Sequence, residues 1–217
     1  MQQQFVNRRG YENLTVFFAG WGMDGNPFRD FYAPESDVLI LYDYTDLRFE
    51  GRILDDYAAV RVVSWSLGVW VVSAMQSQFP RLAEEAVAVN GTPFPVDETK
   101  GIPPAIFDGT LQGLSESTLA KFDRRMCGDR QTLSEFDSVH PARSICSLVE
   151  ELEWIGRECR VRDVDPKFIR AVVGCRDAIF PAVNQQKAWH RICPVEVVDS
   201  AHYDRGLIRS LVRGGDA

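Results

Sequence analysis

Six short apolar runs recur along this chain, and they constrain its fold more than any other feature. The runs lie at 14–20, 37–43, 59–65, 85–91, 169–174 and 193–199. Each is continuously apolar rather than alternating, which is typical of strands covered on both faces, as in a parallel sheet. Helical patterns follow three of the runs, at 67–79, 181–190 and 204–213. This repeated order of strand and helix predicts an α/β fold with a mostly parallel sheet.

The stretch from about 101 to 165 interrupts that order. It contains no convincing strand but two helical segments, "SESTLAKFDRRM", which opens with the capping-type Ser115, and "SICSLVEELEWIGREC". We expect one domain over 1–217, a length sufficient for a substantial core, with a helical insertion at about 101–165. The insertion is either a cap over an active site or an ordinary pair of covering helices.

Composition excludes several classes of protein. A net charge of −7 argues against a nucleic-acid binder, because phosphate contacts need a basic surface. The five cysteines include no C-x-x-C pair, which is typical of reduced thiols in a cytosolic protein rather than of a disulfide framework or a zinc site. The first residues are polar, unlike a signal peptide, and no apolar run approaches the ~20 residues of a membrane span. We therefore expect a cytoplasmic protein that binds neither membrane nor nucleic acid.

The third apolar run passes directly into a helical pattern through Ser64-Trp65-Ser66-Leu67-Gly68. In a G-x-S-x-G elbow the nucleophilic serine has strained backbone angles, and the residues two before and two after it must be small. Here Ser66 is central and Gly68 is intact, whereas Ser64 replaces the first glycine. The strand before this turn and the helix after it favour a nucleophile over the alternative, a turn that is merely polar.

A nucleophilic serine needs a base. Of the three histidines, His202 lies on the loop after the last predicted strand, at the edge where open α/β sheets bind ligands. His140 precedes a proline in the insertion and is expected in a loop, and His190 is expected at an exposed helix end. His202 is therefore the predicted base, although a lone histidine is more often structural.

The base must in turn be oriented by an acid. Asp177 comes just after the fifth predicted strand and completes the chain order serine, acid, histidine that is typical of this kind of elbow. Asp199 lies on the last strand end, where it would more naturally cap a turn, and Asp43 follows the second strand. Asp177 is the preferred candidate.

The remaining requirement is a pair of donors for the negative charge that develops on the substrate oxygen. Gly20-Trp21-Gly22 follows the first apolar run directly, and glycines there allow the backbone to approach a substrate. We expect the amides of Trp21 and Leu67 to form this oxyanion hole. The alternative is a glycine-rich turn with a core tryptophan.

Five segments together resemble the BioG-type pimeloyl-[acyl-carrier protein] methyl ester esterases of biotin synthesis. They are "LTVFFAGWGMD", "VVSWSLGVW", "VNGTPFPVDETKGIPPAIFDGT", "VVGCRDAIFPAVNQQKAW" and the late "AHY". The resemblance implies a compact α/β-hydrolase fold with helices on both faces of the sheet and a small helical cap. It also implies a serine carboxylesterase that hydrolyses the methyl ester of pimeloyl-[acyl-carrier protein], with methanol as the leaving group. No metal or other cofactor is implied.

By the matched motifs the resemblance makes Ser66 the nucleophile, His202 the base and Asp177 the acid. It also makes acyl carrier protein the partner, and this partner's acidic helix predicts a basic docking patch. Our candidates are Lys121, Arg124, Arg125 and Arg130, of which the first three are spaced to share a helical face; the rival set is Arg205, Arg209 and Arg213. The alternative for either set is an ordinary solvated face.

The sequence leaves other functions open. The same three side chains would also serve a carboxylesterase of broader specificity or an acyl thioesterase, and a non-catalytic protein that binds an acyl chain or its carrier is a further alternative. Neither the acyl length nor the oligomeric state can be predicted.

Overall fold

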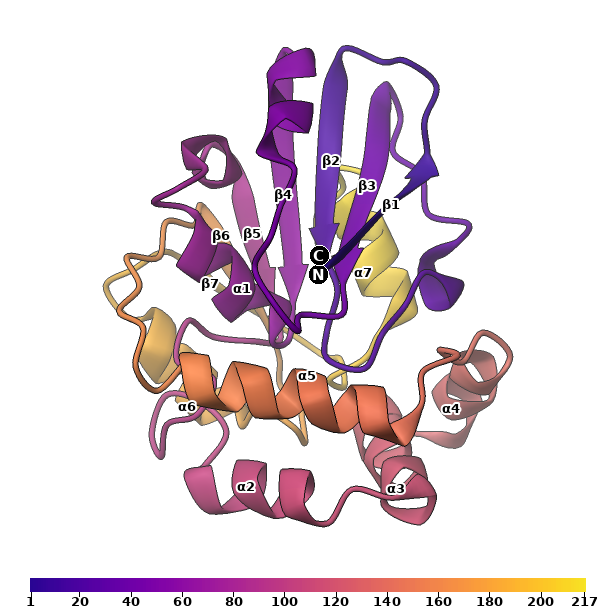
Figure 1. The fold of residues 1–217 in the computed structure, drawn as a ribbon, viewed down its shortest axis with the longest axis vertical. Coiled ribbons are helices and arrows are strands. Elements are labelled where there is room, and N and C mark those ends of the chain that lie inside the picture. The colour runs from indigo at the N-terminus through magenta and orange to yellow at the C-terminus, as the bar shows by residue number, and fades with distance from the viewer.

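The predicted apolar runs form strands of one sheet in the computed structural model, which describes residues 1–217. The sheet has seven strands in the order β1-β3-β2-β4-β5-β6-β7 (Figure 1). These are β1 (Gln2–Asn7), β2 (Asn13–Phe18), β3 (Ser36–Tyr42), β4 (Ala59–Trp65), β5 (Ala86–Val89), β6 (Arg170–Gly174) and β7 (Val195–Val198). All neighbouring pairs are parallel except β1 with β3. The predicted α/β fold with a mostly parallel sheet is confirmed.

Strand β1 was not among the predicted strands. It runs antiparallel to β3 at the edge of the sheet, with Gln2 opposite Tyr42 and Gln4 opposite Ile40. An edge strand has one neighbouring strand and one open side. It is therefore held by backbone hydrogen bonds to that neighbour and does not need a continuously apolar sequence. For that reason the polar start of the chain carried no strand signal.

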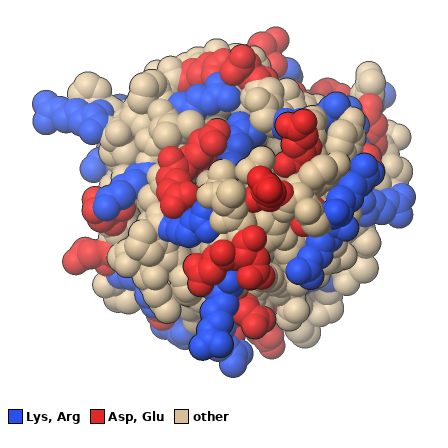
Figure 2. Space-filling model, turned by 90° about the horizontal axis from the view of Figure 1, so that it is seen from above, with Lys and Arg blue, Asp and Glu red and all other residues tan.

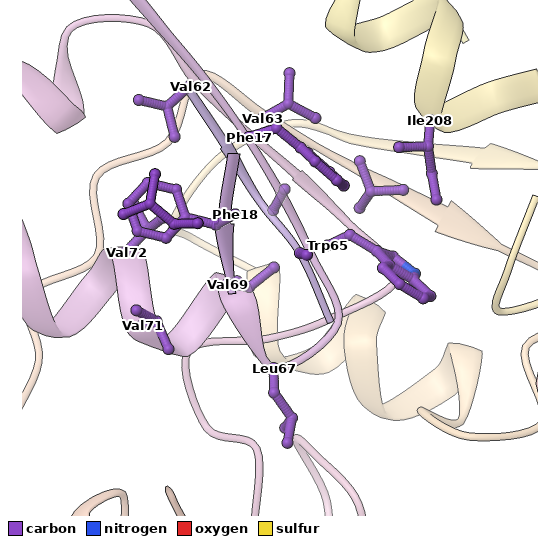
Figure 3. Packing of buried hydrophobic residues seen from close by; sticks show 14 of the residues in the cluster. Phe17, Phe18, Val62, Val63, Trp65, Leu67, Val69, Val71, Val72 and Ile208 are labelled. Carbon is purple, nitrogen blue, oxygen red and sulfur yellow. The ribbon is translucent and has the colours of Figure 1, made fainter. Parts of the chain in front are cut away.

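The helices that cover the sheet are α1 (Gly68–Met75), α6 (Ala182–Trp189) and α7 (Arg205–Val212). Helices α1 and α7 lie on opposite faces, and the side chains of the central strands alternate between them (Figure 3). Phe18 points toward Val72 of α1, whereas Trp65 lies on the side of Ile208 of α7. All four side chains are buried, which explains why the central strands are continuously apolar.

Four helices lie between β5 and β6, and they extend across the carboxyl ends of the parallel strands (Figure 1). They are α2 (Pro104–Gln112), α3 (Glu116–Cys127), α4 (Arg130–Asp137) and α5 (Ile145–Glu158). Ser115, Asp129 and Ser144 cap the last three by accepting a hydrogen bond from the amide three residues later. The two predicted helical segments correspond to α3 and α5. We refer to α2–α5 as the cap helices.

Charge is mixed on the end of the molecule away from the cap helices. Figure 2 shows this end, where Lys and Arg side chains are interspersed with Asp and Glu. No helix is both long enough and apolar enough to cross a membrane.

Candidate active site

Ser66 occupies the turn between β4 and α1 with a positive φ of 58°, a strained conformation for a residue with a side chain. The turn is tight because the helix begins against the end of β2. A Cβ on Gly68 would lie 2.6 Å from the carbonyl oxygens of both Phe18 and Ala19. Ser64, which replaces the usual glycine, is accommodated because its buried hydroxyl donates to the carbonyl of Val87 at 3.3 Å. The sequence therefore forms the strained elbow that its spacing predicts.

The elbow brings Ser66 into line with the predicted base and acid. His202 Nε2 lies 2.9 Å from Ser66 Oγ, and His202 Nδ1 lies 2.9 Å from Asp177 Oδ2. All three residues are buried. When Nδ1 carries the proton it donates to the carboxylate, which leaves Nε2 free to accept the serine proton. This arrangement can activate the serine hydroxyl as a nucleophile.

Further hydrogen bonds fix the carboxylate of Asp177. Its Oδ1 accepts from the amides of Ile179 at 2.8 Å and Phe180 at 2.9 Å. Its Oδ2 accepts from Gln185 Nε2 at 2.9 Å, and the same nitrogen donates to the carbonyl of Phe180 at 2.8 Å. Gln185 is fully buried on α6 and was not predicted as a site residue. It holds the acid in the orientation that serves His202.

The loop that carries His202 is anchored by its own carbonyl oxygens. The Trp65 indole and the Asn90 side-chain amide both donate to the carbonyl of His202 at 2.9 Å. Asn90 also donates to the carbonyl of Ala201 at 2.9 Å and accepts from the amide of Gly174 at 2.7 Å. Asn90 therefore ties the ends of β5 and β6 to the histidine loop. It lies far from the loop in sequence, so no local pattern indicated this role.

Two free donors lie beside the serine. No acceptor within the protein takes the amide N–H of Trp21 or that of Leu67, and both residues line the same cavity as Ser66. The loop passes close to the elbow at Gly20, where a Cβ would lie 2.9 Å from the Trp65 ring. Buried amides normally have partners, so two unpaired ones in residues that line a cavity are suited to donate hydrogen bonds to an oxyanion.

The cavity is narrow and apolar, and it opens into a wider groove. Its volume is about 40 Å³, against about 500 Å³ for the adjoining groove between α2 and α3. The cavity is lined by Trp21, Trp65, Ser66, Leu67, Ile102, Ile106, Phe107, Thr110, Phe122, Arg125, Met126, Leu152, Ile179, Phe180 and His202. Five of its eleven apolar lining residues come from the cap helices, so the cap contributes to the width of the cavity.

The predicted docking cluster does not form one patch. Lys121 and Arg125 both line the groove between α2 and α3, and Arg125 also reaches the cavity. Arg124 instead faces a separate hollow between α3 and α4, and Arg130 is the exposed first residue of α4. The prediction that residues 121, 124 and 125 share one face was therefore wrong for Arg124, because the two grooves lie on different sides of α3.

Two arginines of the rival basic set have partners of their own, whereas Arg209 is exposed. On α7, Arg205 pairs with Asp30 and donates to the carbonyl of Pro27 at 3.1 Å. Arg213 stacks over the ring of Tyr32 at 4.4 Å from its centroid. These contacts hold α7 to residues 27–32 of the loop after β2.

The other titratable candidates have different partners. His140 contacts Asp123 at 3.2 Å, and His190 is exposed at the end of α6. Asp199 pairs with Arg176 at 2.6 Å on the surface, whereas Asp43 pairs with Arg143. None of them contacts Ser66. No group of three or more His, Cys, Asp or Glu side chains is placed to hold a metal ion.

The sheet order, its crossing helices and the serine elbow after β4 define an α/β hydrolase. Solved structures share this fold: a hydrolase from Pseudomonas aeruginosa superposes with a TM-score of 0.65 at 12% identity, over 96% of this chain and 88% of that chain. The chain belongs to the BioG family, because the family described as "Pimeloyl-ACP methyl esterase BioG" matches residues 1–208. The predicted resemblance is confirmed, and the family is one of hydrolases.

Two relatives extend the comparison. The crystal structure of BioG from Haemophilus influenzae superposes with a TM-score of 0.88 at 37% identity, over 95% of each chain. A malonyl-[acyl-carrier protein] O-methyltransferase from Bacteroides fragilis (strain 638R) is 43% identical over 202 residues. That match includes 91% of this chain but spans only 41% of the length of the relative.

Proposed function

We propose that this protein is a serine carboxylesterase that hydrolyses the methyl ester of pimeloyl-[acyl-carrier protein] in biotin synthesis. The products are methanol and pimeloyl-carrier protein. One observation carries the proposal: in a member of the BioG family, Ser66, His202 and Asp177 form a continuous chain of hydrogen bonds at an apolar cavity. A serine hydroxyl in such a chain is activated for attack on an ester carbonyl.

In the first half of the reaction Ser66 Oγ forms a bond to the ester carbonyl carbon as its proton moves to His202 Nε2. The carbonyl oxygen becomes an oxyanion and accepts hydrogen bonds from the amides of Trp21 and Leu67. Asp177 stabilises the imidazolium by accepting from Nδ1. The tetrahedral intermediate then expels the methoxy group, which takes the proton from His202 and leaves as methanol.

The second half releases the acyl chain. Water enters the position left by methanol, gives a proton to His202 Nε2 and attacks the acyl carbon, forming a second oxyanion on the same two amides. As this intermediate collapses, the bond from Ser66 Oγ to the acyl carbon breaks, Ser66 Oγ takes back the proton from His202, and the carboxylic acid departs. The acid then loses its proton to bulk water and becomes the carboxylate.

The shape of the site supports a long acyl chain attached to a carrier. The narrow apolar cavity suits methylenes next to the ester, and the wider groove gives the remainder of the chain a route to the surface. Lys121 and Arg125 line that groove, where cationic side chains would meet the anionic groups of an acidic carrier protein. A methyltransferase acting on a malonyl carrier protein, as the Bacteroides relative is named, would supply an ester of the kind removed here.

The test mixes the purified protein with methyl-pimeloyl carrier protein and follows loss of the methyl group by intact mass. Ser66→Ala removes the nucleophile, and Ser73→Ala is the matched control because Ser73 is a buried serine of α1 that bonds only the carbonyl of Val69. We expect demethylation by the wild type and by Ser73→Ala, and none by Ser66→Ala. Cleavage of short activated esters alone would leave a serine esterase without the biotin role, and no cleavage of any ester would refute the proposal.

A further inference from the structure

A fully buried carboxylate on the cap has no part in the steps above. Glu151 extends from α5 toward the sheet, and both of its oxygens accept hydrogen bonds from backbone amides of other segments. Oε1 accepts from the amide of Tyr44 at 2.9 Å, after β3, and Oε2 accepts from the amide of Gly22 at 3.2 Å, after β2. One side chain of the cap therefore joins two loops of the sheet.

Arg143 is the cationic partner of Glu151. Its Nη1 lies 3.2 Å from Glu151 Oε2 and donates to the carbonyl of Met23 at 3.1 Å. Its Nη2 donates to Asp43 Oδ1 at 2.8 Å and to Ser147 Oγ at 2.7 Å. The guanidinium thus binds the same loop after β2 that Glu151 binds, at Met23, one residue after Gly22.

That loop also carries the proposed oxyanion donor Trp21. The Trp21 indole donates to the carbonyl of Leu148 on α5 at 2.9 Å, and the hydroxyl of Tyr44 donates to the carbonyl of Ala19 at 2.9 Å. Gly22 has a φ of +78°, so the chain reverses next to Trp21. The contact of Tyr44 before Trp21 and the contacts of α5 at Trp21 and Gly22 therefore bracket the unpaired Trp21 amide while leaving the amide itself free.

From this arrangement we propose that Glu151 is a positioning residue, which aligns the Trp21 amide by holding residues 20–23 against α5. The inference rests on the proposed function, since it assigns a cause to the alignment of an oxyanion donor. A buried ion pair adds little stability compared with apolar residues of the same volume, so its presence here is better explained by geometry. Only a carboxylate offers an acceptor to both amides at once.

The protonation state of Glu151 bears on this role. Burial raises the pKa of Glu151 to about 7, whereas the charge of Arg143 and the amides of Tyr44 and Gly22 act in the opposite direction and Asp43 adds to the increase. The other titratable group nearby is the phenol of Tyr44, whose pKa is raised well above its usual range by burial and by the charge of Glu151, so it stays neutral. Protonation turns one oxygen into a donor that opposes an amide N–H, which loosens one loop. The alignment of Trp21 is therefore expected to weaken as the pH falls through about 7.

The experiment compares Glu151→Gln and Glu151→Asp with Glu153→Gln, an exposed residue of the same helix. Glutamine keeps the shape but opposes one amide with an NH₂, and aspartate keeps the charge opposite Arg143 but is too short to reach both amides. With a chromogenic ester we expect kcat to fall about 10- to 100-fold in both, less than the ~10²–10³-fold loss of a whole donor. KM should change less than twofold, and Glu153→Gln should match the wild type.

A second measurement separates alignment from folding. A trifluoromethyl ketone or boronic acid forms a tetrahedral adduct on Ser66, so its affinity should fall in proportion to kcat in the Glu151 variants. Folded variants with unchanged kcat and unchanged adduct affinity would overturn the inference. If neither variant folds, the NMR resonances of the Gly22 and Tyr44 amides in the wild type decide between the outcomes. A common titration of both resonances near pH 7 supports the inference, and resonances that do not shift between about pH 6 and 8 overturn it.

The two proposals fail in different ways. If the wild type cleaves no ester, the proposed function is wrong, whatever the variants do. If the wild type is active and the Glu151 variants equal it, only the positioning role is wrong.

Discussion

The substitution Asp177→Asn would leave the shape of the site almost unchanged while exchanging one carboxylate oxygen for an amide nitrogen. Oδ1 accepts from two backbone amides, and Oδ2 accepts from His202 and Gln185. An asparagine oxygen in the Oδ2 position would leave the NH₂ against the two backbone donors. We therefore expect the oxygen at Oδ1 and the NH₂ toward His202.

In that orientation the tautomer of His202 is reversed. The NH₂ donates to Nδ1, so the ring proton moves to Nε2, which then donates to Ser66 Oγ and cannot accept its proton. The corresponding change in the serine protease triad lowers kcat by about 10⁴, and a loss of this size is expected here. At 1.36 kcal/mol per decade it equals about 5 kcal/mol of transition-state stabilisation. The fold should persist, because the one acceptor lost to Gln185 costs about 1–3 kcal/mol.

The assay is the initial rate of chromogenic ester hydrolysis, with thermal melts to establish that each variant is folded. Asp199→Asn is the matched control, since Asp199 is an exposed aspartate that pairs with Arg176 rather than with His202. It should remain within twofold of the wild type. An Asp177→Asn protein with activity within tenfold of the wild type would show that the tautomer argument is wrong, and so would an inactive Asp199→Asn protein.

Three further predictions test the elbow, the buried carboxylate and the docking groove. Gly68→Ala places a Cβ 2.6 Å from backbone oxygens, so denaturant unfolding should show a loss of about 1–3 kcal/mol, whereas Gly109→Ala, with no atom within 4 Å, should show none. Burial raises the pKa of Glu151 from 4.5 to about 7, so the folded protein binds this proton more tightly than the unfolded chain does. The resulting contribution to the free energy of unfolding is full below pH 4.5 and is lost as the pH rises through 7. The free energy of unfolding relative to Glu151→Gln should thus fall by about 3 kcal/mol between about pH 4.5 and 8, and a constant difference would contradict the linkage. Lys121→Glu should raise the KM for the carrier-bound ester about tenfold without changing the KM for a small ester. Arg124→Glu, on the other side of α3, should leave both KM values unchanged. Equal effects of the two substitutions would exclude this groove as the docking site.

The sequence alone was sufficient to predict the central strands of the sheet and the turn that carries Ser66, because both depend on neighbouring residues in the chain. The continuously apolar runs are typical of strands covered on both faces, and the small residues around Ser66, between a strand and a helix, favour a tight turn that carries a nucleophile over one that is merely polar. The proximity of Ser66, Asp177 and His202 then follows from parallel strands whose carboxyl ends meet at one edge. Strand β1 escaped prediction because an edge strand is held by the backbone hydrogen bonds of β3 rather than by apolar side chains of its own.

The supporting residues of the site could not be predicted in this way. Gln185 and Asn90 act through partners 8 and 112 residues away along the chain, and their positions carry no periodic or motif signal. Glu151 looked like one of several acidic residues on an amphipathic helix, and only the packing of α5 over the sheet shows that it is buried. Such residues are identified by contacts between distant segments, which depend on the complete fold.

The attachment of α5 to residues 20–23 divides the cap into two parts with different freedom to change. Helices α2 and α3 line the cavity and groove but form no hydrogen bond to this loop, although Phe122 of α3 packs edge-on against Trp21 at 5.2 Å. With that contact kept, they could be exchanged between related esterases to alter which chain lengths are accepted. Helix α5 supplies Leu152 to the cavity wall but also binds the loop through Glu151 and Leu148. A graft that includes α5 would have to carry its matching loop, and engineering of chain-length preference should begin with α2 and α3.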